Sequence, residues 1–285
     1  MMRKIIKIFS HLLIIVTFSL LIFTKGVSSQ EVSEPTFDKA YKDYSESLEQ
    51  YRQAHEEYLL ARSQYLQFKT LKSKSDAQEK TANMLMARDE VVIRYLIILR
   101  SRLKDALGTT DEKLLNLNLQ IDTEINWFEG HKKNLRSAGT LEDLVSDSDE
   151  AKDRFEKDEV VFYEVLSNVS SGKVINFRKR MNEIFSNLKA KLSEIYSADD
   201  PEYKLSAEKI ATIDRWILEV EGRIVRSEEA QLEADDLLSK LQKLMRIDNF
   251  TYGEIISVLG QSNQYLKESS SFIREILREV KTAEL

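Results

Sequence analysis

The feature that most constrains the fold is a run of core-type residues that recurs at alternating steps of three and four near the C-terminus. This spacing keeps one stripe of an α-helix turned toward a partner helix, as knobs-into-holes packing requires. We therefore predict a helix over 201–247 that packs along its length against another helix. The members of the run are Tyr203, Ser206, Ile210, Ile213, Ile217, Val220, Ile224, Ser227, Gln231, Ala234, Leu238, Leu241 and Met245.

The segment 251–282 carries a matching run of core-type residues. Only a few residues connect it to the preceding segment, so the two helices are expected to form an antiparallel C-terminal hairpin, 201–282. Polar residues interrupt both runs. They could fix the register of the helix pair, or they could simply be small enough to pack beside large side chains of the partner helix. The interrupting residues are Ser227, Gln231, Ser262 and Ser269.

The rest of the chain is also rich in helix-forming residues, with two prolines and eight glycines among 285 residues. Alternating strand-like patterns are hard to find, so we predict an all-α fold, an elongated antiparallel bundle of coiled-coil hairpins. About six helices are expected, with breaks placed at glycine, proline and capping residues. The predicted ranges are 36–107, 110–136, 140–168, 173–197, 201–247 and 251–282.

Several breaks rest on specific residues. Gly108 is expected to end the first helix in a left-handed conformation, and Thr109–Glu112 to cap the second. Thr140–Asp143 repeats this restart signal, the run 170–172 is expected to separate two helices, and 199–201 to open the fifth. Together the helices between 110 and 197 would link the long first helix to the C-terminal hairpin.

The first predicted helix, 36–107, has two contrasting parts. Residues 69–81 hold one large apolar residue, Leu71, so this stretch is either a hinge or a solvated part of a continuous helix. A continuous helix would extend on the order of 105 Å. The stretch 91–99 is apolar on almost every side and is expected to lie at the centre of the bundle.

Four tyrosines recur every seven residues near the start of this helix: Tyr44, Tyr51, Tyr58 and Tyr65. They belong to a run at steps of three and four, which indicates a core seam in which each ring is buried and its hydroxyl reaches the rim. The alternative is an exposed aromatic strip that binds a glycan or a partner helix. These four residues are the only candidate binding site that the sequence offers.

The first 29 residues have the layout of a secretory signal peptide, with basic residues, then an apolar run, then small residues before position 30. The alternative is an uncleaved N-terminal membrane anchor. Both interpretations predict an extracytoplasmic location for residues 30–285, whether secreted, periplasmic or on the cell surface.

The residues after position 29 include 48 acidic and 38 basic side chains. This acidic balance argues against nucleic-acid binding and against anionic lipids, so a membrane is expected to meet only the N-terminal segment. A protein partner or self-association through the 37–68 segment is expected instead. No cysteine occurs, so disulfides and thiolate chemistry are excluded.

Motifs that mark catalytic or metal sites are missing. His55 and His131 lack the Glu-x-x-His spacing of a di-iron bundle, and Lys152 stands where a calcium loop needs glycine. We therefore expect no enzyme activity, no cofactor and no catalytic or metal-binding residue. An enzyme would require a carboxylate-only site, which a convergent pair of buried carboxylates in a polar pocket would reveal.

Three stretches, 40–71, 139–144 and 170–188, are similar to those of uncharacterised exported helical proteins of bacteria. The resemblance implies a bacterial origin and an all-helical fold, and it carries no activity or site residue.

These observations predict a non-enzymatic, exported helical protein that acts through its surfaces as a cell-envelope interaction, spacer or adhesion-type module. Two alternatives stay open. One is a membrane-perturbing or pore-forming protein that inserts residues 91–99, although Arg94 and the short length oppose a span. The other is an extracytoplasmic ligand-binding bundle.

Overall fold

The structure is a computed structural model that describes residues 35–106, 108–197, 205–243 and 249–281. The predicted signal peptide or anchor, the segment 199–201 and the ends of the seam at Tyr203 and Met245 lie outside these ranges. Within them the fold is all-α, with six helices and no strand. The helices are α2 (Phe37–Phe68), α3 (Leu71–Leu103), α4 (Asp111–Ser137), α5 (Leu141–Ser197), α6 (Ala207–Lys243) and α7 (Asn249–Lys281).

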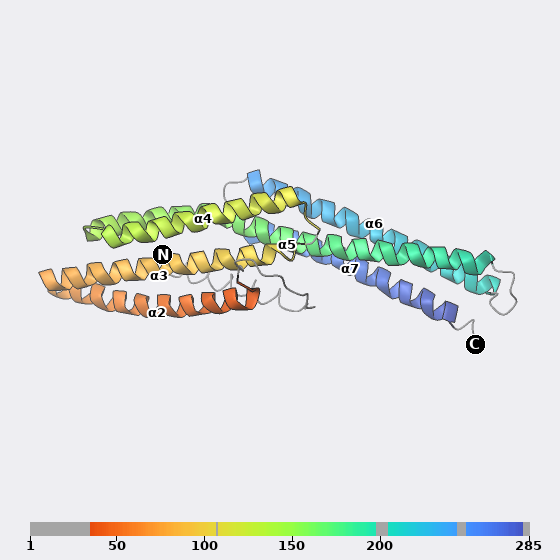
Figure 1. Cartoon of the computed structure of the whole chain (residues 1–285), viewed down its shortest axis with the longest axis horizontal. Coiled ribbons are helices and arrows are strands. Elements are labelled where there is room, and N and C mark those ends of the chain that lie inside the picture. The colour runs from red at the N-terminus through yellow and green to blue at the C-terminus, as the bar shows by residue number, and fades with distance from the viewer. Residues whose placement is uncertain (1–34, 107, 198–204, 244–248, 282–285) are drawn as a thin grey trace. The chain divides into compact units, whose positions relative to one another are not determined.

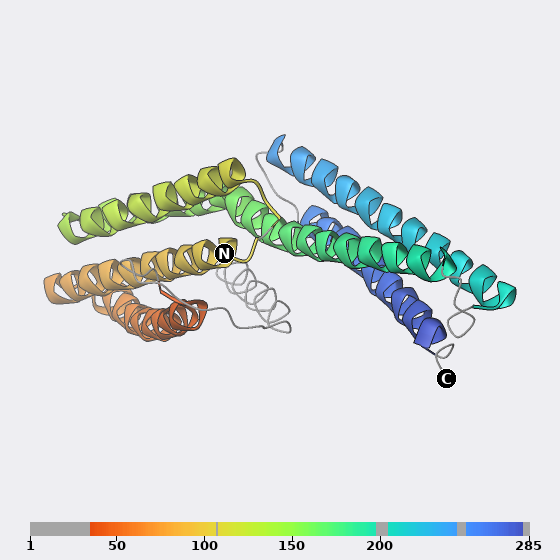
Figure 2. The ribbon, with the colours of Figure 1, turned by 45° about the vertical axis from the view of Figure 1, so that its right-hand side comes forward.

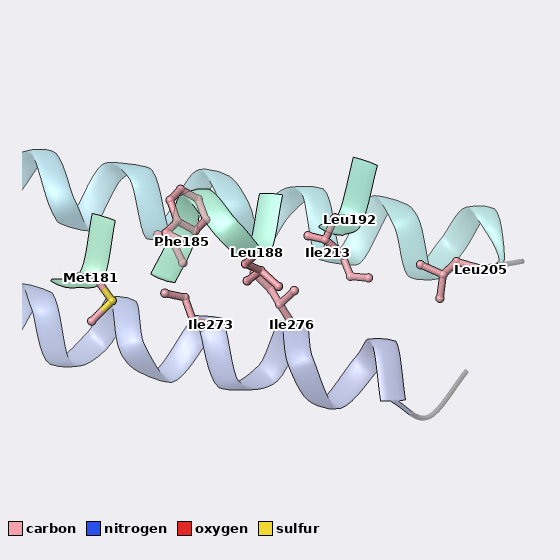
Figure 3. Packing of buried hydrophobic residues seen from close by; sticks show 9 residues of the cluster. Met181, Phe185, Leu188, Leu192, Leu205, Ile213, Ile273 and Ile276 are labelled. Carbon is pink, nitrogen blue, oxygen red and sulfur yellow. The ribbon is translucent and has the colours of Figure 1, made fainter. Parts of the chain in front are cut away.

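The long helix α5 connects two groups of helices (Figure 1). Its first part packs with α3 and α4, where the side chains of Leu85, Leu135 and Leu144 form a buried cluster. Its last part packs with α6 and α7 through a larger apolar cluster (Figure 3). Both views of the ribbon show α2 lying along α3 (Figure 2).

The C-terminal hairpin packs through its predicted seams. In α6 the heptad-spaced residues Ile213, Val220, Ser227 and Ala234 are buried, and on α7 the matching stripe includes Leu266. The side chains of Met181, Phe185, Leu188 and Leu192 of α5 complete this core (Figure 3). The heptad spacing therefore predicted both the pairing and the inward face.

Of the two alternatives for 36–107, the continuous helix is wrong, because the chain reverses at Lys69 and Thr70, at the start of the stretch 69–81 where a hinge was predicted. Lys69 adopts a left-handed conformation, φ 51° and ψ 29°, and its N–H donates to the Tyr65 carbonyl oxygen at 2.9 Å. The Thr70 side chain and Ser73 then form a reciprocal capping box that begins α3. The stretch predicted as a hinge or solvated helix is thus a tight turn followed by regular helix.

The predicted break at 170–172 is also wrong, since α5 is one unbroken helix of 57 residues that runs through this stretch. Gly172 serves a close helix contact: a Cβ atom there would lie 2.9 Å from the Cα atom of Ala106. Ala106 belongs to the α3–α4 connection, which crosses α5 at this point. The glycine allows this backbone approach, and helix α5 is not interrupted.

Three capping predictions have different outcomes. Gly108 has no positive φ, and α4 is capped by Thr110, whose hydroxyl accepts from the Lys113 N–H at 3.4 Å. The prediction of a cap at Thr109 is therefore off by one residue. The Thr140–Asp143 box is confirmed, because each side chain accepts a hydrogen bond from the other residue's backbone N–H, at 3.1 and 2.8 Å.

Candidate functional site

The four candidate tyrosines lie along the α2–α3 contact. Tyr44 is 2 % exposed, and its ring lies 6.0 Å from that of Tyr95 on α3. Tyr51, Tyr58 and Tyr65 are half-buried on the same stripe of α2. Because α3 covers this stripe, the arrangement favours the core seam over a free aromatic strip.

Tyr44 also belongs to a wider aromatic group inside the bundle. The Tyr95 ring meets Phe162 of α5 edge-on, with ring centroids 5.4 Å apart. Tyr163, which follows Phe162 in α5, packs against Tyr252 of α7, with ring centroids 4.7 Å apart. Burial, with a smaller contribution from Tyr41, raises the pKa of Tyr44 to about 12. These phenols stay neutral at physiological pH and act as packing groups.

A buried ion pair joins α3 to α4. The Asp89 carboxylate Oδ2 lies 2.5 Å from Nδ1 of His131, and neither side chain is accessible to solvent. His131 Nε2 lies 3.0 Å from the backbone carbonyl oxygen of Asp147, and its ring stacks on Trp127. Both neighbours of the ring present acceptor oxygens, an arrangement that favours the doubly protonated imidazolium form of His131.

The pKa of His131 reflects competing effects. Burial lowers it, but the hydrogen bond to Asp89 and the charge of that carboxylate outweigh burial, so the pKa lies above the ordinary value of 6.5. Arg88 lies beside the same carboxylate at 3.3 Å and also donates to Ser148 of α5 at 3.1 Å. The pair is therefore one point at which three helices meet through polar contacts.

A second buried ionic group joins α4 to α5. Arg154 donates two hydrogen bonds to the Glu124 carboxylate, each 2.6 Å long, and lies 3.6 Å from Asp158. Burial, aided by a hydrogen bond to Glu124 and its charge, raises the pKa of Asp158 to about 8. With this pKa, Asp158 keeps its proton at neutral pH, beside the Arg-bound Glu124.

This group holds the two convergent buried carboxylates by which a carboxylate-only active site would be recognised. Here a guanidinium occupies both oxygens of Glu124, an arrangement typical of a structural bidentate pair. Asp158 nevertheless carries a proton that it loses as the pH rises through about 8, so the charge of this group depends on pH.

The seam positions could have revealed both ionic groups from the sequence. Buried residues of α4 follow steps of four and three, and Glu124 and His131 stand within them: Leu117, Ile121, Glu124, Phe128, His131 and Leu135. In α5, Asp158 falls on the buried heptad of Leu144, Ala151 and Val165. A charged residue at a seam position indicates a buried partner.

Three exposed, large apolar side chains flank the α2–α3 turn. Leu66 is 54 % exposed, Phe68 61 % and Leu71 89 %. Apolar side chains that are more than half exposed and grouped around one turn are typical of an interaction surface.

Two further properties bear on function. No helix within the described ranges is long and apolar enough to cross a membrane. Among the same residues, no cluster of three or more histidine, aspartate or glutamate side chains is arranged to hold a metal ion.

Comparison with protein-family models, with curated proteins and with solved structures finds no match to this chain.

Proposed function

We propose that this protein is an exported, non-enzymatic helical module that acts through its surfaces, in the cell envelope, as an interaction, spacer or adhesion-type component. The observation that carries the proposal is the exposed apolar turn between α2 and α3. More than half of the surface of Leu66 and Phe68, and nearly all of that of Leu71, is exposed, so these side chains are available to a partner. Export rests on the residue order of the first 29 positions.

The buried charged groups support a structural use of the interior. Asp89 and His131 satisfy each other between α3 and α4, and Arg154 satisfies Glu124 between α4 and α5. Their hydrogen bonds run between helices and hold their relative positions. The tyrosine stripe of α2 contributes in the same way, which leaves the outer faces as the interaction surfaces.

Cell fractionation with N-terminal sequencing of the native protein tests the proposal. We expect recovery outside the cytoplasm, either as a product that begins at Gln30 or as a membrane-bound chain that begins at Met1. A chain found in the cytoplasm with its first residues intact would overturn it. Substituting Glu124→Gln and Asp158→Asn should leave this distribution unchanged in the folded fraction, since neither residue is assigned a surface role.

A further inference from the structure

The structure assigns a specific contact to the α2–α3 turn: we infer that residues 59–75, the turn segment, dock onto an anionic lipid surface by inserting Leu66, Phe68 and Leu71 between the headgroups. This inference rests on the proposed function, because it names the partner of the exposed turn. It departs from the expectation that a membrane meets only the N-terminal segment.

Charge is distributed unevenly along the chain. The turn segment contains four basic residues and no acidic one, although acidic residues outnumber basic ones overall: Arg62, Lys69, Lys72 and Lys74. None of these four forms an ion pair with another residue in the part of the chain that the structure describes. The nearest acids along the two helices are Glu57, which pairs with Lys80 at 2.7 Å, and Asp76.

The turn also projects beyond the neighbouring elements. The Gln78 side chain donates to the carbonyl oxygen of Ala138 at 3.3 Å, which places the α4–α5 connection beside Gln78. Leu71 lies seven residues earlier, roughly 10 Å farther along the axis of α3. Figure 1 shows the linked ends of α2 and α3 lying beyond the ends of α4 and α5. A flat surface can therefore reach the turn first.

At physiological ionic strength, charges farther away than about 8 Å are largely screened. Acidic side chains farther along the bundle are screened in this way, whereas Asp76, one helical turn from Lys72, lies within this distance and offsets part of the attraction. Lysine next to exposed leucine and phenylalanine is the composition that favours the interface of an anionic bilayer.

The backbone of the turn is suited to contact with a lipid surface. Lys69 N–H donates to the Tyr65 carbonyl oxygen at 2.9 Å, and Thr70 N–H donates to the Ser73 hydroxyl at 3.0 Å. Ser73 N–H donates to the Thr70 hydroxyl at 3.1 Å. Because these three donors are satisfied within the turn, the backbone cost of bringing its apolar side chains to the headgroup region is lowered.

The test uses a fluorophore at the turn. The full chain has no cysteine, so Leu71→Cys provides one site for an environment-sensitive dye, and Leu232→Cys provides a matched exposed site on α6. With phosphatidylcholine vesicles that contain phosphatidylglycerol, we expect a blue shift and a several-fold intensity gain at position 71. The label at position 232 should change little, and Lys69→Glu with Lys72→Glu should abolish the gain at position 71.

Three outcomes overturn the inference: no response at position 71 on anionic vesicles, an equal response on pure phosphatidylcholine, or a response to polyglutamate without one to vesicles. The label reads the turn itself, so binding through the N-terminal segment cannot imitate a positive result. A silent turn in a protein that still fractionates outside the cytoplasm would remove this inference and leave the proposed function standing.

Discussion

Ser262 on α7 lies opposite Ser227 on α6, and its hydroxyl donates a hydrogen bond to the Ser227 carbonyl oxygen at 2.6 Å. The two side-chain oxygens are 2.9 Å apart, and both residues are fully buried. Farther along the seam, the Ser269 hydroxyl donates to the Val220 carbonyl oxygen at 3.4 Å. A slip of one heptad would place Ser262 opposite Val220 or Ala234 and break its contact with Ser227, so the Ser227–Ser262 pair favours one register.

Ser262→Ala should therefore lower the free energy of unfolding by about 1–3 kcal/mol, because the buried Ser227 hydroxyl loses its partner. Ser227→Ala combined with Ser262→Ala should cost less than the sum of the single changes, with a coupling of about 1 kcal/mol. Urea unfolding measures both values. Ser271→Ala is the control, since that exposed hydroxyl bonds within its own helix. Equal effects at positions 262 and 271 would refute the pairing.

The contact between Gly172 and Ala106 gives a second prediction. Gly172→Ala should destabilise the protein by about 2–3 kcal/mol, because the added Cβ atom meets backbone that cannot rotate away. Gly222→Ala in α6 is the matched control: nothing lies within 4 Å of its Cβ position, and alanine should stabilise that helix by about 0.5–1 kcal/mol. Thermal unfolding should show opposite signs, and the same sign at both sites would contradict the close approach.

These glycines show which parts of the fold can be predicted from the sequence. The α6–α7 seam and the Thr140–Asp143 cap depend on residues close together in the chain, and both were predicted correctly. Whether Gly172 ends a helix or permits a contact depends on Ala106, which is distant in sequence. A hinge was one alternative for 69–81, but a full reversal at Lys69 was not predicted, because the left-handed residue there is neither glycine nor asparagine.

The candidate site was predicted less well for a similar reason. The tyrosine stripe was predicted as a seam from its spacing, but the helix that covers it could be identified only after the reversal at Lys69. Glu124 and Asp158 are two of 48 acidic residues, and their seam positions distinguish them only once the seams of α4 and α5 are known. The exposure of Phe68 and Leu71 likewise depends on the turn between them.

The raised pKa of Asp158 predicts a pH dependence of stability. The folded protein holds a proton that the unfolded chain releases near pH 4, so this contribution is complete below that pH and is lost as the pH rises through about 8. The free energy of unfolding should fall between pH 5 and 7 by up to about 1.4 kcal/mol per pH unit from this group.

Asp158→Asn should remove that slope, because an amide cannot release the proton, and the variant should gain stability relative to the wild type as the pH rises. Urea unfolding at several pH values measures the slope. Asp153→Asn, an exposed change on the same helix, should keep the wild-type profile. If Asp158→Asn retained the full slope, the proton would reside elsewhere.

The Asp89–His131 pair predicts a histidine that stays charged at neutral pH. Nitrogen-detected NMR titration should give His131 a pKa above 6.5, and Asp89→Asn should move it below 6.5, because burial then acts without the opposing carboxylate. The stabilisation from this group is complete below pH 6.5 and is lost as the pH rises through the folded-state pKa.

Asp89→Asn should also lower the free energy of unfolding at pH 6 by about 3 kcal/mol, since it removes one partner of a buried ion pair. Asp153→Asn serves again as the control and should leave the His131 titration unchanged. A wild-type His131 pKa below 6.5 would contradict the prediction, because it would show that the Asp89 contact does not outweigh burial.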